Sequence, residues 1–267
     1  MDLLEKIVKA KKAGILKDKE KTPVSSLENS KYFESPVRSL AGALRNKNGY
    51  GIIAEFKRRS PSRGIINAGA MPGKVCPAYL NSGAAAVSVL TNEEFFGGSN
   101  RDFLEARALC GGPLLRKEFI IDEYQVIESK SLGADVVLLI ADILTEKELK
   151  GLSELALSLN MEVLFEIHDE SGINKLPGNC KLVGVNSRNL GTFSINMDVP
   201  SKIIDKLPGN SIKIAESGIH SAEKLVEFNQ QGFSGFLIGE MFMKERDPGE
   251  ECKRLIRDIE NLQAIQT

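Results

Sequence analysis

Charged side chains stand at the ends of several short apolar runs in this chain. Glu55 and Lys57 close one run, Lys117 lies near the end of another, and Glu166 lies near the end of a third. If these runs are parallel strands of one sheet, their carboxyl ends meet on one face, so the ammonium and carboxylate groups gather there. A lysine ammonium donates a proton and a glutamate carboxylate accepts one, which is the chemistry of general acid–base catalysis.

Two further runs also end in polar groups. Asn186 and Arg188 follow one of them, and Glu216 and Ser217 end the other. Any one of these residues alone is equally well a solvated strand end or half of a structural ion pair. Because removing several charges from water in one place is unfavourable, five such strand ends together favour a functional cluster.

Glycines at two strand ends indicate phosphate binding. Gly218 and Gly239 expose backbone N–H groups where barrels commonly bind phosphate, and Lys57 adds a cation. The loop 58–64, RRSPSRG, contains Ser60 and predicts a mobile lid near the same anion. The structural alternatives are tight turns at the two glycines and a solvated basic turn at the loop.

Other chemistries find little support in the sequence. His168 and His220 lack a third ligand, and no HExxH spacing occurs, so we expect no metal. The motifs GxSxG, GxGxxG and GxxxxGK[ST] are absent. A Schiff base on Lys117 stays open as a minor alternative, since barrel interiors are the usual place for such a lysine.

Eight apolar runs, most of them apolar at consecutive positions, are typical of strands covered on both faces. They lie at 50–56, 84–90, 113–119, 135–140, 161–167, 181–186, 211–217 and 235–240. Helical segments separate them without a linker. The pattern predicts one α/β domain spanning 1–267, a single (β/α)8 TIM barrel, with an open doubly wound sheet as the alternative.

The helix signals are of three kinds. Thr145 and Glu148 form a capping-box pattern, and Asp122 and Ser221 are expected N-caps, with Gly133 and Gly232 as the matching stops. The stretch 171–180 contains Pro177 and two glycines, which predicts a short or irregular helix.

An N-terminal helical extension over 1–48 precedes the first strand. We expect one helix at 2–16 and a second, shorter one near 36–46, with polar, Ser-rich sequence between them. The extension has too few apolar residues to build a core alone, so it is expected to pack on the barrel.

Composition excludes several classes of protein. The 267 residues carry 35 Lys and Arg against 36 Asp and Glu, and this net charge of -1 gives no electrostatic basis for binding nucleic acid. No run of about 18 apolar residues or signal peptide is present, so we expect a cytoplasmic chain without a membrane partner. The four cysteines are far apart and are expected to be free thiols. A monomer is the default expectation.

Seven segments, in this order and spacing, resemble the indole-3-glycerol-phosphate synthase family. They are IIAEFKRRSPSRG, SVLTNEEFFGGS, LLRKEFIIDEYQV, FEIHDE, VGVNSRNLGTF, IAESGI and FLIGEMFM. The resemblance runs from about residue 40 to 245 and includes the long N-terminal extension. It implies a lyase of tryptophan biosynthesis that needs no cofactor and acts on a small sugar phosphate. In that reaction, 1-(2-carboxyphenylamino)-1-deoxyribulose 5-phosphate loses CO2 and water and closes to indole-3-glycerol phosphate.

The resemblance also implies roles for residues of this sequence. Lys117 is the implied acid that protonates the carbonyl, Glu166 and Glu55 are the carboxylates, and Lys57 lies near the phosphate and assists dehydration. Asn186 and Arg188 are implied to orient the hydroxyls and the anthranilate carboxylate. The implied catalytic residues are Glu55, Lys57, Lys117, Glu166, Asn186 and Ser217, and the implied substrate-binding residues are Lys57, Ser60, Arg188, Glu216, Gly218, Gly239 and Glu240.

The sequence departs from the family pattern in a few places. Ser187 stands where a second Asn is usual, Ala215 where Ser is commoner, and 66–77 lacks an Asp-Pro pair. None of these removes an implied catalytic group. Two other readings stay open: a catalytically silent sugar-phosphate-binding barrel, and a related barrel such as phosphoribosylanthranilate isomerase or an aldolase.

Overall fold

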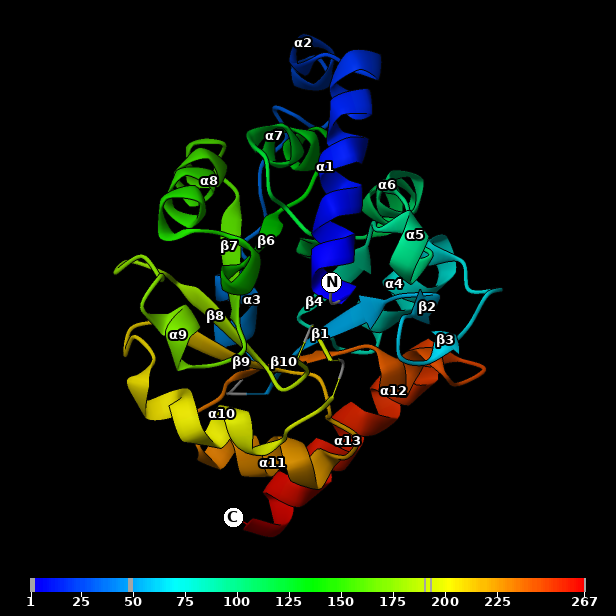
Figure 1. The fold of residues 1–267 in the computed structure, drawn as a ribbon. Helices are drawn as coiled ribbons and strands as arrows, with labels where there is room; N and C mark the ends of the chain where they lie inside the picture. The colour runs from blue at the N-terminus through cyan, green and yellow to red at the C-terminus, as the bar shows by residue number, and fades with distance from the viewer. Residues whose placement is uncertain (1–2, 48–49, 190, 193, 267) are drawn as a thin grey trace.

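Eight parallel strands close into a barrel in the computed structural model, which describes residues 3–47, 50–189, 191–192 and 194–266 (Figure 1). The strands, named in order around the barrel, are β1 (Gly51–Phe56), β10 (Gly235–Ile238), β9 (Ile212–Glu216), β8 (Leu182–Asn186), β7 (Glu162–Ile167), β6 (Val136–Ile140), β5 (Leu114–Lys117) and β4 (Ala86–Leu90). The predicted TIM barrel is confirmed, and the open doubly wound sheet is wrong. Parts of two predicted segments, residues 1–2 and 48 of the extension and residues 190 and 193 of VGVNSRNLGTF, lie outside the described residues.

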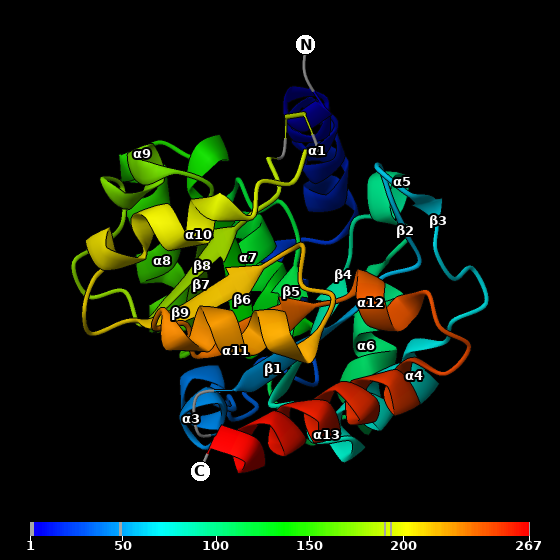
Figure 2. The ribbon, with the colours of Figure 1, turned by 90° about the horizontal axis from the view of Figure 1, so that it is seen from below.

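Helices surround the strands, and Figure 2 shows α13 running along the outside beside α4 and α11. The helices that follow the strands are α4 (Pro72–Asn81), α5 (Glu93–Phe96), α6 (Asn100–Leu109), α7 (Glu123–Ser131), η1 (Ala141–Ile143), α8 (Glu146–Ser158), α9 (Glu170–Ile173), α10 (Asp198–Ile203), η2 (Ile204–Lys206), α11 (Ala222–Gln230), α12 (Glu240–Met243) and α13 (Pro248–Gln266). After β1, a small hairpin of β2 (Arg59–Ser60) and β3 (Gly64–Ile65) occupies the predicted lid loop.

Both faces of the strands are buried, which explains the consecutive apolar residues. Side chains such as Ile53, Leu138 and Leu164 belong to one buried cluster, and the alternate residues Ile52 and Val137 belong to another, which includes residues of the surrounding helices. The strands end slightly earlier than predicted at three places, because the chain turns away after Lys117, after Glu216 and after Ile238. Ser217, Gly239 and Glu240 therefore lie on loops or helix starts and not on strands.

The predicted helix caps are confirmed. Thr145 and Glu148 form the reciprocal capping box of α8. The side chain of Asp122 accepts a hydrogen bond from the backbone N–H of Tyr124, and that of Ser221 accepts one from Lys224. These contacts satisfy N–H groups that lack a partner within the helix, so each helix begins where the sequence predicts.

Two glycines and one short helix also follow the sequence pattern. Gly133 and Gly232 have φ of 83° and 106°, a left-handed conformation that favours glycine and ends α7 and α11. The stretch 171–180 contributes the last three residues of the four-residue helix α9 and then continues without regular structure up to β8. The predicted irregularity there is confirmed.

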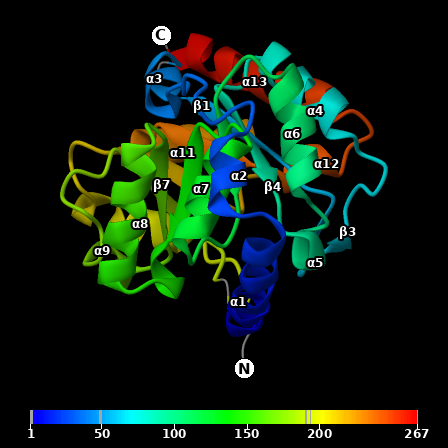
Figure 3. The ribbon, with the colours of Figure 1, turned by 90° about the horizontal axis from the view of Figure 1, so that it is seen from above.

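The N-terminal extension differs from the prediction in its helix boundaries. The first helix, α1 (Leu3–Lys21), runs five residues past the predicted end, because the hydroxyl of Tyr124 on α7 donates to the backbone oxygens of Asp18 and Thr22 and holds that end in place. An unpredicted helix, α2 (Val24–Glu28), follows and lies against α7 (Figure 3).

The short helix before the first strand is α3 (Leu40–Arg45), which begins four residues later than predicted. It starts there because the side chain of Ser39 accepts a hydrogen bond from the backbone N–H of Gly42 and acts as the N-cap. Glu162 at the start of β7 also accepts hydrogen bonds from Ser39 and from the N–H of Ala41. The start of α3 is therefore tied to the amino-terminal end of β7.

The four cysteines, Cys76, Cys110, Cys180 and Cys252, are buried free thiols, as predicted. Burial raises the pKa of Cys252 to about 12 and that of Cys110 to about 11, so these thiols stay protonated near neutral pH. In the described part of the chain, no helix is long and apolar enough to cross a membrane.

We predict that truncation of one α1 side chain destabilises the whole fold. Ile7 is 1% exposed and belongs to the cluster that continues into the barrel interior, so Ile7→Ala should lower the free energy of unfolding by about 2–4 kcal/mol. Urea unfolding measures this. The control is Leu16→Ala on the same helix, where the side chain is 66% exposed and the change should stay within about 0.5 kcal/mol. Equal effects of the two substitutions would show that α1 does not pack on the barrel.

Candidate active site

A cavity lies at the carboxyl ends of the strands. Every site residue that the sequence predicts lines it: Glu55, Lys57, Ser60, Lys117, Glu166, Asn186, Arg188, Glu216, Ser217, Gly218, Gly239 and Glu240. They are spread over 186 positions of sequence, from 55 to 240, and come from six of the eight strands or the loops after them. The closed barrel brings them together.

Lys117 is the centre of the buried charges. Its Nζ donates to Glu166 Oε2 at 2.5 Å and lies 3.5 Å from Glu216 Oε2. The strands that carry these residues, β5, β7 and β9, are not neighbours in the sheet, so the three side chains meet across the barrel interior. Both glutamate side chains are 1% exposed and that of Lys117 is 12% exposed.

Mutual attraction keeps Lys117 and Glu166 charged. Burial alone would lower the pKa of Lys117, but attraction to Glu166, Glu216 and Glu55 outweighs it and raises that pKa. Burial alone would raise the pKa of Glu166, but Lys117 and His168 outweigh it and lower that pKa to about 2. An ammonium therefore faces a carboxylate. Since a Schiff base requires a neutral amine, this arrangement disfavours the imine chemistry that the sequence left open.

Glu216 has the opposite electrostatic character. Burial raises its pKa well above the ordinary glutamate value, and repulsion from Glu166 and Glu55 adds to this, while Lys117 offsets part of it. The carboxyl group has room because residue 184 is a glycine: a Cβ on Gly184 would lie 2.1 Å from Glu216 Oε1. The cavity thus holds one ionised and one protonation-prone carboxyl group beside the same lysine.

A second pair of opposite charges lies on β1 and its end. Lys57 Nζ donates to Glu55 Oε1 at 2.7 Å, and Glu55 is 4% exposed. Gly239 allows this close packing, because a Cβ there would lie 2.7 Å from Glu55 Oε1. The two Lys–Glu pairs give the cavity two proton donors and two proton acceptors.

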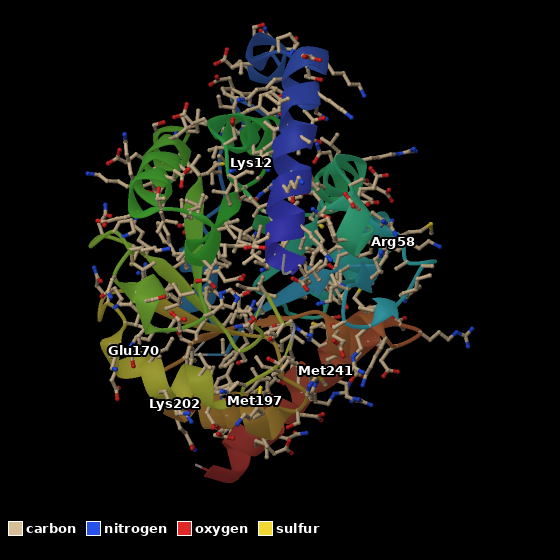
Figure 4. The ribbon with its side chains drawn as sticks, viewed as in Figure 1. Lys12, Arg58, Glu170, Met197, Lys202 and Met241 are labelled. Atoms are coloured by element: carbon tan, nitrogen blue, oxygen red, sulfur yellow. The ribbon has the colours of Figure 1, made fainter. Side chains whose placement is uncertain are left out.

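The two glycine loops flank the second pair. Ser217 and Gly218 both adopt the left-handed backbone conformation, with φ of 66° and 74°. That conformation is unfavourable for a serine, and such strain is commonly kept at functional sites. A Cβ on Gly218 would lie 2.1 Å from the sulfur of Met197, a residue labelled in Figure 4. Close packing therefore fixes the glycine at this loop.

The loop after β1 lies at the mouth of the cavity. Its base is anchored by Arg58 (Figure 4), which makes a two-point ion pair with Asp102 at 2.7 and 2.8 Å. Its tip contacts two other loops of the rim: Arg63 donates to Glu240 at 2.9 Å, and Arg188 donates to the hydroxyl of Ser62 at 3.0 Å. These contacts connect the loop to the segments that follow β8 and β10. Its mobility stays a prediction.

An apolar wall completes the cavity. Phe96 and Phe119, whose ring centroids are 5.9 Å apart, line it together with Leu138 and Ile140. These four residues are not among the predicted site residues. The alternation of Leu138 and Ile140 on one strand was the available signal, since residues two apart point to the same side. A flat apolar surface beside buried charges suits an aromatic ring with polar substituents.

Sequence reasoning also missed two buried polar residues. Glu118, which follows Lys117, lines the cavity and forms an ion pair with Lys11 of α1 at 2.7 Å. His168, two residues after Glu166, lies 3.4 Å from that carboxylate. The spacing of two was a signal for His168. The partner of Glu118 is 107 positions away and leaves no local pattern.

The described residues include no group of three or more His, Cys, Asp or Glu side chains that could hold a metal ion. The two Lys–Glu pairs, the glycine loops and the apolar wall support proton transfer between lysine and glutamate side chains, combined with binding of an anion and an apolar ring.

Comparison with known proteins places these residues in a family. The sequence model of indole-3-glycerol phosphate synthase matches residues 4–255. A curated protein of that name from Bacteroides thetaiotaomicron is 40% identical over 259 residues, which covers 97% of this chain and 99% of the relative. Another from Polaromonas naphthalenivorans is 39% identical over 252 residues, covering 93% and 96%.

Solved structures show the same fold at much lower identity. Tryptophan synthase subunit alpha from Legionella pneumophila is similar with a TM-score of 0.61 and 12% identity, covering 85% of this chain and all of that one. A chain of the tryptophan synthase complex from Pyrococcus furiosus gives 0.57 and 13%, covering 80% and 98%. At such identities the likeness concerns the fold alone.

We predict that Glu216→Gln stabilises the protein at neutral and alkaline pH. A glutamate whose folded pKa lies above its unfolded pKa binds more protons when folded, so its contribution is full below the unfolded pKa and is lost as pH rises through the folded pKa. Glu216→Gln removes the ionisable group and with it this loss of stability at higher pH. Urea unfolding at about pH 5 and about pH 8 should therefore show a smaller decline in stability for Glu216→Gln than for the wild type. The exposed Glu170→Gln is the control, and an unchanged decline in Glu216→Gln would contradict the buried-acid assignment.

Proposed function

Because the chain belongs to the indole-3-glycerol phosphate synthase family, the decarboxylating lyases of tryptophan biosynthesis, we propose that the cavity at the carboxyl ends of its strands performs that family's ring closure. The substrate is 1-(2-carboxyphenylamino)-1-deoxyribulose 5-phosphate, and the products are indole-3-glycerol phosphate, CO2 and water. The observation that carries this assignment of residues is the buried ammonium of Lys117, held 2.5 Å from the carboxylate of Glu166 beside an apolar wall.

Lys117 promotes the first step, the closure of the five-membered ring. The ring carbon that bears the carboxylate attacks the ketone carbon, and Lys117 transfers a proton to the ketone oxygen, which becomes a hydroxyl. The carboxylate then leaves as CO2, and its bonding electrons restore the aromatic ring. The apolar wall of Phe96, Phe119, Leu138 and Ile140 holds the aromatic ring against the reacting carbonyl. Glu166 keeps the ammonium oriented, and Lys117 regains a proton from solvent before the next turnover.

Lys57 and Glu55 promote the second step, dehydration. The nitrogen lone pair expels the new hydroxyl, which leaves as water with a proton from Lys57. Glu55 then removes a proton from the carbon beside the nitrogen, and the indole double bond forms. The 2.7 Å contact between the two side chains supports this pairing, since donor and acceptor lie at the same end of the cavity.

The remaining residues bind the substrate. Ser217, Gly218, Gly239 and the backbone N–H of Glu240 surround the phosphate, as expected for the last two loops of a barrel, and Lys57 adds charge. In addition, Arg188 and Asn186 orient the carboxylate and hydroxyls, and Ser60 contributes from the mouth loop. A protein that only bound sugar phosphates would need the glycine loops and Lys57, but it would have no use for the buried pair of Lys117 and Glu166.

We predict that Lys117→Ala lowers kcat by at least about a hundredfold, the typical size of a general-acid contribution, while substrate binding falls less. Indole-glycerol fluorescence, measured on the pure chain with the carboxyphenylamino substrate, gives both values. Lys150→Ala is the control, because that side chain is 69% exposed on α8. Equal turnover in Lys117→Ala and the control would remove Lys117 from the mechanism, and an inactive wild type would overturn the proposed function.

We further propose that the chain acts as a monomeric, single-domain enzyme in the cytoplasm. All twelve predicted site residues come from one copy of the chain, so the cavity needs no partner. Buried free thiols suit a reducing compartment. Sedimentation equilibrium should give the mass of one chain across the assay concentrations, and a dimer mass at those concentrations would contradict the proposal.

A further inference from the structure

His168 is a buried histidine with no role in the steps described above. Its ring lies between two carboxylates: Nδ1 is 2.6 Å from Asp142 Oδ2, and Nε2 is 3.4 Å from Glu166 Oε1. Asp142 belongs to η1, directly after β6, whereas Glu166 belongs to β7. The histidine therefore connects the reacting carboxylate to a residue on the neighbouring strand end.

The carboxylate of Glu166 is held on both of its oxygens. Oε2 accepts from Lys117, while Oε1 accepts from the amide of Asn186 at 3.1 Å and faces His168. Removing the ring would leave Oε1 with one neutral donor. Because a small misplacement of a reacting group can slow a reaction strongly, this support affects catalysis without touching the substrate.

The charged groups around His168 mostly favour its protonated form. Burial lowers its pKa, but the contact with Asp142 and the attraction of Glu166 outweigh burial and the repulsion of Lys117, so the pKa of His168 is raised. Asp169 on the next position is a further acid nearby, and Lys175 donates to the backbone oxygens of Ala141 and Leu144 beside Asp142. An imidazolium in this place holds Glu166 ionised.

We propose that His168 is a positioning residue for the ring closure, clamped by Asp142 on one side and fixing the orientation and charge of Glu166 on the other. This inference rests on the proposed function, since it assigns to Glu166 a part in the chemistry. Asp142, with 28% of its side chain exposed, acts only through the histidine.

Kinetics of single and double variants test the inference. His168→Gln should lower kcat about tenfold while KM stays near the wild-type value, because the substrate does not touch the ring. Asp142→Asn should lower the pKa of His168. As pH rises, kcat should therefore begin to decline at a lower pH in this variant than in the wild type. In the His168→Gln background, Asp142→Asn should have no further effect. The control is Glu170→Gln, an exposed residue near His168 that pairs with Lys206.

A merely structural histidine would give a different result. In that case, His168→Gln would lower thermal stability while kcat and its pH profile stayed unchanged. The effects of His168→Gln and Asp142→Asn would also add in the double variant. An unchanged kcat in His168→Gln, or additive effects in the double variant, would overturn the inference.

Nuclear magnetic resonance tests the contact without relying on activity. The chain has two histidines, so His168→Gln assigns both imidazole signals. In the wild type, His168 should titrate above its ordinary pKa, and both Asp142→Asn and Glu166→Gln should shift that titration downward. No shift in either variant would overturn the inference. If the shifts occur but the wild type does not form indole-glycerol, the proposed function fails while the Asp142–His168–Glu166 contact stands.

Discussion

The ion pair between Lys117 and Glu166 is the interaction on which the site depends. Two charges taken out of water lose their hydration, and only close contact with opposite charge and further hydrogen bonds can offset that loss. The barrel provides both, because strands that are not neighbours in the sheet place their ends around one small space. Lys117 thus meets Glu166 at 2.5 Å and Glu216 at 3.5 Å. An open sheet would carry the same residues along an edge, where β5 and β9 could not meet.

Two glutamates of equal chemistry acquire different properties from their surroundings. Glu166 has close positive or neutral donors on both oxygens, and its pKa falls. Glu216 is equally buried, and its pKa rises because burial and repulsion from Glu166 and Glu55 outweigh the attraction of Lys117 at 3.5 Å. Pairs of titratable groups whose pKa values are pushed apart mark acid and base roles in active sites. Gly184 makes this possible, because any side chain there would displace Glu216.

The barrel and most of the site were predictable because their signals are local. Apolar runs with a polar end fix the strands, and capping residues such as Thr145 and Asp122 fix the helices. Contacts between distant segments were not predictable, since Tyr124 holds the end of α1 across more than 100 positions and Lys11 meets Glu118 across 107. The helix α2 lies in a polar stretch and depends on packing against α7. His168 had a spacing signal, but its partner Asp142 becomes relevant only once β6 and β7 lie side by side.

The N-terminal extension helps to position the site residues and does not only stabilise the fold. Lys11 on α1 pairs with Glu118, which also accepts hydrogen bonds from Thr91 and from the N–H of Phe119. Glu118 directly follows Lys117, so these contacts hold the end of β5 in place. A short strand of four residues has few ladder hydrogen bonds of its own, and its last side chain carries the ammonium of Lys117. The same helix that buries Ile7 therefore fixes the position from which Lys117 reaches Glu166.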